Sequence, residues 1–188
     1  SYWITNNYRE SYNLFACNGI LFNHESPRRG LNFVTRKISV AVSKINMGKQ
    51  EILELGNLDA KRDWGHAKDY VKAMWIMLQQ KTPQDYVIAT GKSYSVRDFV
   101  TEAFNVIGKK IIWKGKGLKE VGVDSKTKKI YIKINKNYYR PSEVEILLGD
   151  PTKANLELGW KPTISFKELV KEMVLSDLKK VKNNEVFI

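Results

Sequence analysis

The stretch that decides how this chain folds is residues 23–30, Asn-His-Glu-Ser-Pro-Arg-Arg-Gly. It follows an apolar run at residues 14–22, which is typical of a buried strand, and it precedes a helical pattern that starts near Phe33. The stretch therefore connects a strand of an α/β sheet to a helix, and ligands bind to such sheets at the carboxyl ends of strands. Its two arginines could each bond two phosphate oxygens at once. The alternative interpretation is a polar surface turn ended by Pro27 and Gly30.

Composition limits the possible class of protein. The chain has 188 residues, of which 43% are hydrophobic, enough for one domain or for a domain with a subdomain. The one cysteine, Cys17, excludes an internal disulfide and favours a reducing compartment, so we expect a cytoplasmic protein. Two histidines and one cysteine give no metal-ligand cluster, and no apolar stretch is long enough for a bilayer. We therefore predict no metal site and no membrane partner.

The net charge of +12 favours an acidic partner, which could be nucleic acid, a membrane surface or a phosphorylated small molecule. Lysines are densest between Lys109 and Lys136, where few acids offset them. They are not interleaved with a set of aromatic residues that could stack on bases. A solvated, lysine-rich face is therefore favoured over a nucleic-acid site.

Hydrophobic periodicity predicts strands that alternate with helices. Apolar residues at spacings of three and four predict helices over residues 33–47, 66–80 and 95–107, with further helices starting near 150 and 165. Short strands are expected at residues 51–55, 85–89, 111–113 and 130–134, and a mobile Gly- and Lys-rich excursion is expected over 114–129. Trp64 and Trp75 are expected in the core. This alternation favours the α/β class.

Two features suggest that the chain is part of something longer. There is no Gly-x-Gly-x-x-Gly after a strand and no phosphate loop of the Walker type, so a nucleotide-binding fold would need its first half from elsewhere. Residues 1–12 look like the last turns of a helix, and the sequence starts without Met.

Five motifs carry a resemblance to a known family. They are Asn-His-Glu-Ser-Pro-Arg-Arg-Gly at 23–30, Phe-Val-Thr-Arg-Lys-Ile at 33–38, Arg-Asp-Trp-Gly-His-Ala-Lys-Asp-Tyr at 62–70, Tyr-Tyr-Arg-Pro-Ser-Glu-Val at 138–144 and Gly-Asp-Pro-Thr-Lys-Ala at 149–154. In this order they resemble the GDP-mannose 4,6-dehydratases, which belong to the extended short-chain dehydrogenase/reductases. The resemblance covers nearly all of residues 1–188. It implies an α/β fold made of the end of a Rossmann-type sheet and a smaller substrate-binding subdomain.

The family also has an N-terminal half, which carries the glycine fingerprint and the catalytic Thr, Glu and Tyr-x-x-x-Lys residues. None of these is present, so we expect the catalytic residues upstream of Ser1 and an inactive fragment. The resemblance implies a lyase that converts GDP-mannose to GDP-4-dehydro-6-deoxy-mannose with tightly held NADP, a step towards GDP-fucose. It also implies self-association as a dimer or tetramer.

Matching motif positions implies binding roles for eight residues. The residues implied to contact NADP are His24 and Arg29. The residues implied to contact the GDP-sugar are Asn23, Val34, Lys37, Arg62, Arg140 and Glu143. Val34 and Lys37 would meet guanine, Arg62 and Arg140 would hold the diphosphate, and Glu143 would accept hydrogen bonds from the ribose. The alternatives are core packing for Val34, an ion pair with Asp63 for Arg62 and a helix cap for Glu143.

Two other functions remain open. A related GDP- or UDP-sugar epimerase or reductase would be distinguished by its preference for guanine or uracil. The second is a non-catalytic basic module that binds nucleotides or nucleic acid. A nucleic-acid-binding module would show a steep loss of DNA affinity with salt and no binding of GDP.

Overall fold

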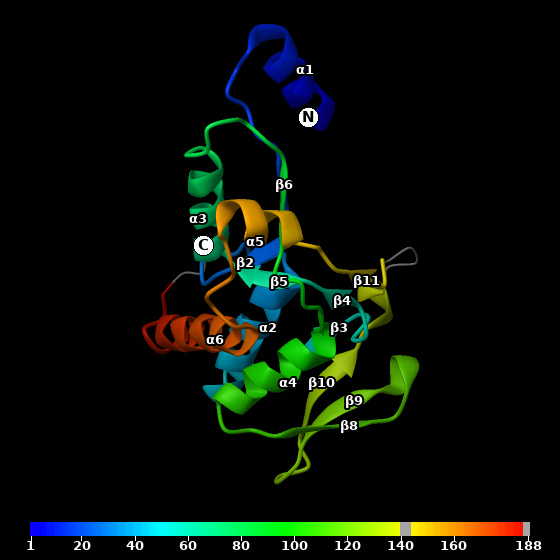
Figure 1. The fold of residues 1–188 in the computed structure, drawn as a ribbon. Coiled ribbons are helices and arrows are strands. Elements are labelled where there is room, and N and C mark those ends of the chain that lie inside the picture. Colours follow the sequence, from blue (N-terminus) through cyan, green and yellow to red (C-terminus); the bar gives the residue numbers. More distant parts are fainter. Residues whose placement is uncertain (140–143, 186–188) are drawn as a thin grey trace. The chain divides into compact units, whose positions relative to one another are not determined.

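The computed structural model describes residues 1–139 and 144–185 of the chain (Figure 1). The chain forms two compact units, which are described separately below. Unit 1 comprises residues 1–24, 63–93 and 147–166, and unit 2 comprises residues 25–62, 94–146 and 167–188.

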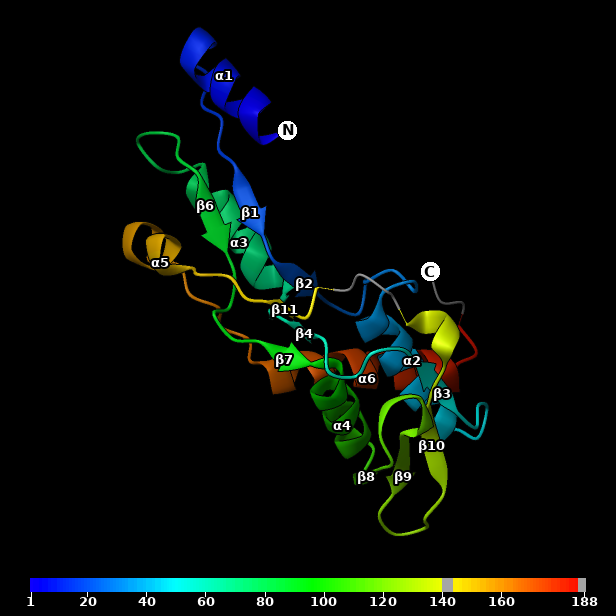
Figure 2. The same ribbon diagram turned by 90° about the vertical axis from the view of Figure 1, so that its right-hand side faces the viewer.

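Unit 1 is built on two parallel strands, β1 (Gly19–Leu21) and β6 (Tyr86–Ile88), with Gly19 opposite Tyr86. Parallel strands require a long connection, and its last part is β5 (Trp64–His66) followed by α3 (Ala67–Met77). Figure 2 shows α3 running alongside β1 and β6. Helix α5 (Thr152–Leu158) packs against β6 and α3. This arrangement is the strand–helix–strand unit from which Rossmann-type sheets are made.

The core of unit 1 forms between α3, β6 and α5. Its members are buried apolar side chains, and they include Tyr70, Ala73, Met77, Ile88, Ala154 and Trp160. Trp160 donates from Nε1 to the carbonyl of Asp69 at 2.8 Å, and the Asp69 carboxylate accepts from the Thr163 hydroxyl at 2.6 Å. The large indole is therefore buried without an unsatisfied N–H.

The first helix, α1 (Tyr2–Tyr12), has no buried residue and stands off from the rest of unit 1 (Figures 1 and 2). Asn13 ends it in the left-handed conformation, at φ 52°. The strand predicted over residues 14–22 proves too long, because only Gly19–Leu21 pairs and its partner β6 has three residues. Phe15 and the residue before it are consequently about half exposed.

Unit 2 contains a four-stranded sheet with strand order β3, β10, β9, β8. The strands are β3 (Leu53–Leu55), β8 (Ile111–Lys114), β9 (Val121–Asp124) and β10 (Ile130–Ile134). β10 is parallel to β3 and antiparallel to β9. Helices α2 (Val34–Asn46) and α4 (Val96–Val106) pack against each other and bury the apolar side chains Ile38, Val42, Phe99, Val100 and Phe104.

The remaining elements are short, except for the last helix. β4 (Lys61–Arg62) pairs antiparallel with β7 (Tyr94–Ser95). The other elements are β2 (Asn23–Glu25), β11 (Ile146–Leu147), the 3-10 helices η1 (Gly117–Lys119) and η2 (Lys136–Tyr138), and α6 (Phe166–Lys182). None of the helices in the described ranges combines the length and apolarity that a bilayer span requires.

Local sequence signals placed several helix ends correctly. Gly48 follows α2 with φ 69°, the left-handed conformation that glycine adopts at low cost. At the start of α4, the Ser95 hydroxyl accepts from the Asp98 amide at 3.0 Å, and the Asp98 carboxylate accepts from the Ser95 amide at 2.8 Å. Ser95 and Asp98 therefore form a capping box, a motif recognisable from Ser followed three residues later by an acid. Helix α5 begins at Thr152, with Pro151 at the cap position, one residue later than the sequence indicated.

Two predictions, one for a segment and one for a side chain, are wrong. Residues 114–129 do not form an irregular excursion, because β9 lies within them and pairs with both β8 and β10. Gly122 allows this close pairing, since a Cβ there would lie 2.6 Å from the Ile132 side chain. The second error concerns the tryptophans: Trp64 is buried as expected, but Trp75 is 64% exposed on α3. Helical periodicity identifies the apolar face of a helix, but it does not show whether another element packs against that face.

Candidate functional site

The stretch at residues 25–33 of unit 2 is a loop held by its own hydrogen bonds. The Arg29 amide donates to the Ser26 carbonyl at 3.0 Å, and the Arg28 amide donates to the Ser26 hydroxyl at 3.1 Å. The Phe33 amide donates to the Gly30 carbonyl at 3.2 Å, just before α2 begins. The loop therefore has a defined conformation that leads directly into the first turn of α2.

A buried carboxylate, that of Glu25, lies beneath this loop and is 1% exposed. Thr35 in the first turn of α2 donates its hydroxyl to Glu25 Oε2 at 2.7 Å, and Arg29 Nε lies 3.2 Å from the same oxygen. The Arg29 guanidinium also stacks on the Phe33 ring, 3.4 Å from its centroid. Burial raises the pKa of Glu25, whereas the Thr35 hydroxyl and the Arg29 charge act in the opposite direction.

The structure gives Arg29 two partners and leaves its side chain 21% exposed. Glu25 engages the Nε side of the guanidinium, and Phe33 covers one flat face. Because a guanidinium has five N–H donors, the fork can still bind a phosphate at the surface. The predicted contact between Arg29 and NADP is compatible with this arrangement and stays a prediction.

Asn23 and His24 belong to unit 1, and both are half-buried. His24 Nδ1 lies 2.9 Å from the Phe22 carbonyl, and the imidazole stacks on the Tyr70 ring with centroids 4.9 Å apart. Its orientation is therefore fixed by packing within the unit. The predicted roles of Asn23 in sugar binding and of His24 in cofactor binding stay predictions.

Lys37 lines a pocket of about 290 Å³ in unit 2. The pocket lies between α2 and the segment that leads into β3, and its wall includes Leu31, Ile52 and Tyr138. Lys37 Nζ lies 3.4 Å from the centroid of the Tyr138 ring, a cation–π contact. The pocket combines apolar walls with a cation and an aromatic ring, which suits a flat heteroaromatic base. Val34 is half-buried and does not line it, so its predicted contact with guanine stays a prediction.

Arg62 ends β4 in unit 2 and is half-buried. Its Nη1 donates to the backbone carbonyls of Lys61 at 2.8 Å and Val144 at 2.7 Å. The other two predicted nucleotide ligands, Arg140 and Glu143, lie outside the described residues. Val144 is the last residue of the sequence motif that contains Arg140 and Glu143.

Asp63, the proposed alternative partner of Arg62, has other partners in unit 1. Its carboxylate accepts from the Thr90 hydroxyl at 2.7 Å, the Thr90 amide at 2.8 Å and the Gly91 amide at 2.9 Å. This fully buried carboxylate therefore organises a turn of unit 1.

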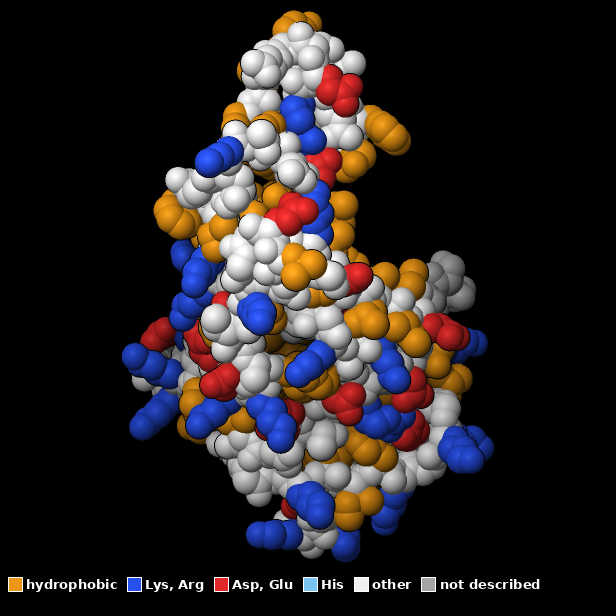
Figure 3. Space-filling model, in the orientation of Figure 1, with side chains coloured by type: hydrophobic (Ala, Val, Ile, Leu, Met, Phe, Trp, Pro, Cys, Tyr) orange, Lys and Arg blue, Asp and Glu red, His pale blue; other side chains and the backbone are white. Residues whose placement is uncertain are grey.

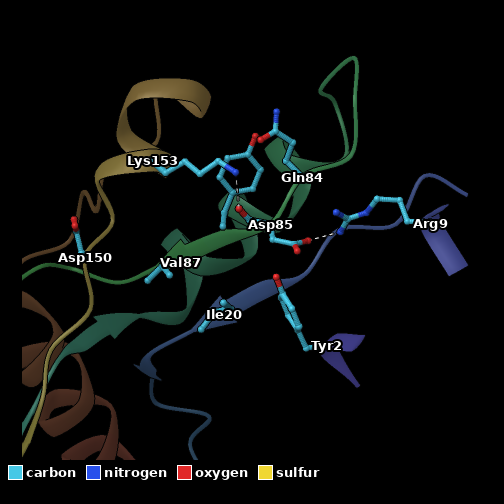
Figure 4. A pocket seen from close by; sticks show the side chains of 9 residues that line it. Tyr2, Arg9, Ile20, Gln84, Asp85, Val87, Asp150 and Lys153 are labelled. Atoms are coloured by element: carbon cyan, nitrogen blue, oxygen red, sulfur yellow. Dashed lines mark hydrogen bonds and ion pairs between the residues drawn. The ribbon is translucent and has the colours of Figure 1, made fainter. Parts of the chain in front are cut away.

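Unit 1 has a larger pocket, of about 430 Å³, that contains none of the predicted site residues. Figure 4 shows Arg9 and Asp85 pointing toward each other across it. Arg9 bonds to the Asp85 carboxylate, and its Nε donates to the Ala16 carbonyl at 2.7 Å. Lys153 Nζ donates to the Asp85 carbonyl at 3.0 Å. These contacts tie α1 to β6, which is a structural role.

The lysine-rich stretch of unit 2 contains three of the four strands of its sheet, β8, β9 and β10. Residues 109–136 carry ten lysines and two acids, a net charge of +8. Both acids are engaged locally, Asp124 by the Thr127 hydroxyl at 2.7 Å and Glu120 by Arg97 at 2.5 Å. Figure 3 shows basic side chains around the turn between β9 and β10. Nothing in this arrangement distinguishes a binding surface from the solvated face that the sequence favours.

Four side chains lie at these sites in the structure but were not predicted from the sequence. They are Glu25, Phe33, Thr35 and Tyr138. The first three lie in or next to the loop, and Tyr138 precedes Arg140 in its motif. The spacing of Glu25 and Arg29, four residues apart, was a usable signal for an ion pair. Among the described residues there is no group of three His, Cys, Asp or Glu side chains that could hold a metal ion.

Comparison with known proteins adds independent information about this set of motifs. A sequence profile of the family described as GDP-mannose 4,6 dehydratase matches residues 1–173, which is most of the chain. The chain belongs to the GDP-mannose 4,6-dehydratase family.

Curated members of the family are closely similar in sequence. The GDP-mannose 4,6 dehydratase of Homo sapiens is 60% identical over 184 residues, which is 98% of this chain and 50% of that protein. That of Drosophila melanogaster is 58% identical over 98% of this chain and 47% of its own length. The chain thus spans about half the length of the curated relatives it matches.

Solved structures agree on the fold. The RMD protein of Pseudomonas aeruginosa, in complex with NADPH, has a TM-score of 0.76 at 16% identity over 94% of this chain and 52% of its own. The dTDP-glucose 4,6-dehydratase of Bacillus anthracis, in complex with NAD, has a TM-score of 0.70 at 19% identity over 97% and 50%. These similarities confirm the predicted α/β fold with part of a Rossmann-type sheet. At such low identity they show the fold alone.

Proposed function

We propose that these 188 residues are the C-terminal, substrate-binding half of a GDP-mannose 4,6-dehydratase. This enzyme would convert GDP-mannose to GDP-4-dehydro-6-deoxy-D-mannose and water. The observation that supports it best is 58–60% identity to curated members of the family over 98% of the chain. At this identity an epimerase or reductase of another nucleotide sugar is the weaker alternative.

The role of this half is to hold the nucleotide. Arg62 and Arg140 would grip the diphosphate, because charge-assisted bonds from two guanidiniums fix a pyrophosphate in place. Lys37 and the pocket around it would take the guanine, with Val34 beside it and Glu143 accepting hydrogen bonds from the ribose. Asn23 would bond the sugar or the diphosphate. Anchoring the phosphates leaves the hexose free to present its carbons to the reacting groups.

The proposed cofactor is NADP, which would supply the hydride acceptor and donor of the reaction. This chain would contribute His24 and Arg29 to its binding. The guanidinium of Arg29 fits a phosphate ligand, because it is held on two sides and remains partly exposed. The residues that exchange protons with the sugar would lie in the other half of the enzyme. We therefore expect the 188 residues alone to be inactive.

Two further properties are part of the proposal. Self-association as a dimer or tetramer is expected from membership of the family, and a location in the cytoplasm is expected from the single cysteine. Sedimentation of the full-length enzyme would measure the first, and microscopy of a tagged protein in the source cells would measure the second.

The experiment is an assay of the full-length enzyme with GDP-mannose, in parallel with the isolated 188 residues. The expected result is the 4-keto product from the full-length enzyme and none from the fragment. UDP-glucose and dTDP-glucose are the control substrates, and neither should yield product at a comparable rate. Turnover of a UDP-sugar in preference to GDP-mannose would refute the proposed substrate. Product from the pure fragment would refute the assignment of catalysis to the other half.

A further inference from the structure

Glu25 is an unusual residue to find beneath a ligand-binding loop. Its carboxylate is 1% exposed and follows directly after His24, at the end of β2. Burying a carboxylate is costly unless it is paired and hydrogen-bonded. The partners are Thr35, with its hydroxyl at 2.7 Å, and Arg29, with Nε at 3.2 Å. The buried Glu25 carboxylate is therefore stabilised by both Thr35 and Arg29.

These contacts restrain Arg29 in two directions. Glu25 fixes the inner edge of the guanidinium, and the Phe33 ring at 3.4 Å fixes its plane. A free arginine loses considerable rotamer entropy when it binds a ligand. An arginine that is already held on an edge and a face loses less, so its remaining donors are presented to a phosphate in a fixed geometry.

The same carboxylate also connects the loop to α2. Thr35 lies in the first turn of the helix whose later residue Lys37 lines the pocket of unit 2. A negative charge at this end of a helix interacts favourably with the helix dipole. Glu25 thus forms an ion pair with the arginine of the loop and accepts a hydrogen bond from the first turn of the helix.

We propose that Glu25 is a positioning residue that orients the Arg29 guanidinium toward a phosphate of the cofactor. This inference rests on the proposed function, in which Arg29 contacts NADP. Glu25 itself touches neither cofactor nor substrate. Its effect is transmitted through the ion pair with Arg29, and the Thr35 bond keeps the carboxylate in place.

The test uses the full-length enzyme and four variants: Glu25→Gln, Arg29→Ala, the double variant and Lys126→Ala as the control. Glutamine keeps the shape and the acceptor for Thr35 but removes the charge that faces Arg29. The affinities for NADP and NAD are measured by calorimetry, and denaturant unfolding is measured alongside. Glu25→Gln should weaken NADP binding on the order of tenfold, because Arg29 loses the ion pair that holds one edge of its guanidinium. The loss for NAD should be smaller if Arg29 meets the phosphate unique to NADP.

The double variant decides whether Glu25 acts through Arg29. Because both would act on one contact, the double variant should bind NADP no more weakly than Arg29→Ala does. The control Lys126→Ala removes an exposed cation of the same unit, between β9 and β10, and should bind NADP within about twofold of the unmodified enzyme. A loss in the double variant equal to the sum of the single losses would overturn the inference.

Other outcomes separate this inference from the proposed function. If Arg29→Ala weakens the binding of NADP and Glu25→Gln does not, the inference is wrong and the cofactor role of Arg29 stands. If Arg29→Ala leaves NADP affinity unchanged, that role fails and the inference fails with it. Should Glu25→Gln not fold, Phe33→Leu releases the other restraint on the same guanidinium. Unchanged NADP affinity in Phe33→Leu would also be evidence against the positioning of the Arg29 guanidinium.

Discussion

Unit 2 contains two arginine–carboxylate pairs beside α2, and they differ in one respect. Arg36 and Asp177 are both 0% exposed, whereas Glu25 is 1% and Arg29 is 21% exposed. Arg36 Nη1 lies 2.5 Å from Asp177 Oδ1, and Ser39 donates its hydroxyl to Oδ2 of the same carboxylate at 2.7 Å. This enclosed pair joins α2 to α6. In the pair of Glu25 and Arg29, part of the Arg29 guanidinium stays at the surface, so this side chain can also contact a ligand.

The difference shows how to interpret a buried charge in a fold of this kind. A pair that is enclosed on all sides can only stabilise or specify the packing of helices. A pair with one buried and one partly exposed partner can also fix the geometry of the exposed partner. The predictions below test this division, from the largest expected effect to the smallest.

The largest effect is expected at Asp177. Asp177→Asn should lower the free energy of unfolding of the full-length enzyme by about 3–5 kcal/mol, because it leaves the Arg36 charge buried without its counter-ion. The matched control is Asp59→Asn, since Asp59 is a 78% exposed partner of Arg97 and should cost less than about 1 kcal/mol. Urea unfolding measures both. Equal costs would show that enclosure does not distinguish the pairs.

A second prediction extends the comparison to the arginines proposed to bind the diphosphate. Arg62→Ala and Arg140→Ala should each cost about 1.5–3 kcal/mol of GDP affinity, roughly ten- to a hundredfold. Guanosine has no phosphate, so its affinity should fall much less. The double variant should be non-additive, because both residues would hold one pyrophosphate. Calorimetry with GDP and guanosine measures this, and an equal loss for both ligands would assign the arginines to the base or to the fold.

The pH dependence of stability should distinguish Glu25 from an exposed acid. Burial raises the pKa of Glu25 above its ordinary 4.5, so the folded state holds this proton more tightly than the unfolded state does. Its stabilising contribution is therefore complete below the unfolded pKa and is lost as pH rises through the folded pKa. Glu25→Gln, which does not titrate, should gain stability relative to the unmodified enzyme over that interval.

The expected change is smaller than that at Asp177, because the Thr35 hydroxyl and the Arg29 charge offset part of the burial. Denaturant unfolding between pH 4 and pH 7 compares the two proteins. A constant difference in unfolding free energy across this range would mean that Glu25 titrates alike in the folded and unfolded states.

The smallest effect is expected at Phe33. Its ring supports the partly exposed Arg29 by a contact of the kind that contributes about 0.5–1 kcal/mol at surface sites. Phe33→Leu keeps an apolar side chain but removes the flat face, so NADP affinity should fall about two- to fivefold. Unfolding measurements on the same variant provide the control. A loss as large as that of Arg29→Ala would mean that Phe33 does more than orient the guanidinium.

The sequence by itself determined features that depend on near neighbours. The capping box of Ser95 and Asp98 and the end of α2 at Gly48 follow from residues within a few positions of each other. The alternation of strands and helices predicted the α/β class, and the ordered motifs predicted the family. The predicted contacts of the eight binding residues remain to be tested.

Only the tertiary structure decided which faces and which charges are enclosed. Trp64 lies in a polar stretch of the sequence and is buried, whereas Trp75 lies among apolar residues and is exposed on α3. Arg36 and Asp177 are 141 residues apart, and no local pattern relates them. Strand β9 was hidden by its lysine-rich flanks, because a strand is stabilised by the neighbours that pair with it. Enclosure depends on contacts between distant segments. The four-residue spacing of Glu25 and Arg29 can indicate an ion pair, but only the fold shows that Glu25 is buried and that Arg29 stays partly exposed.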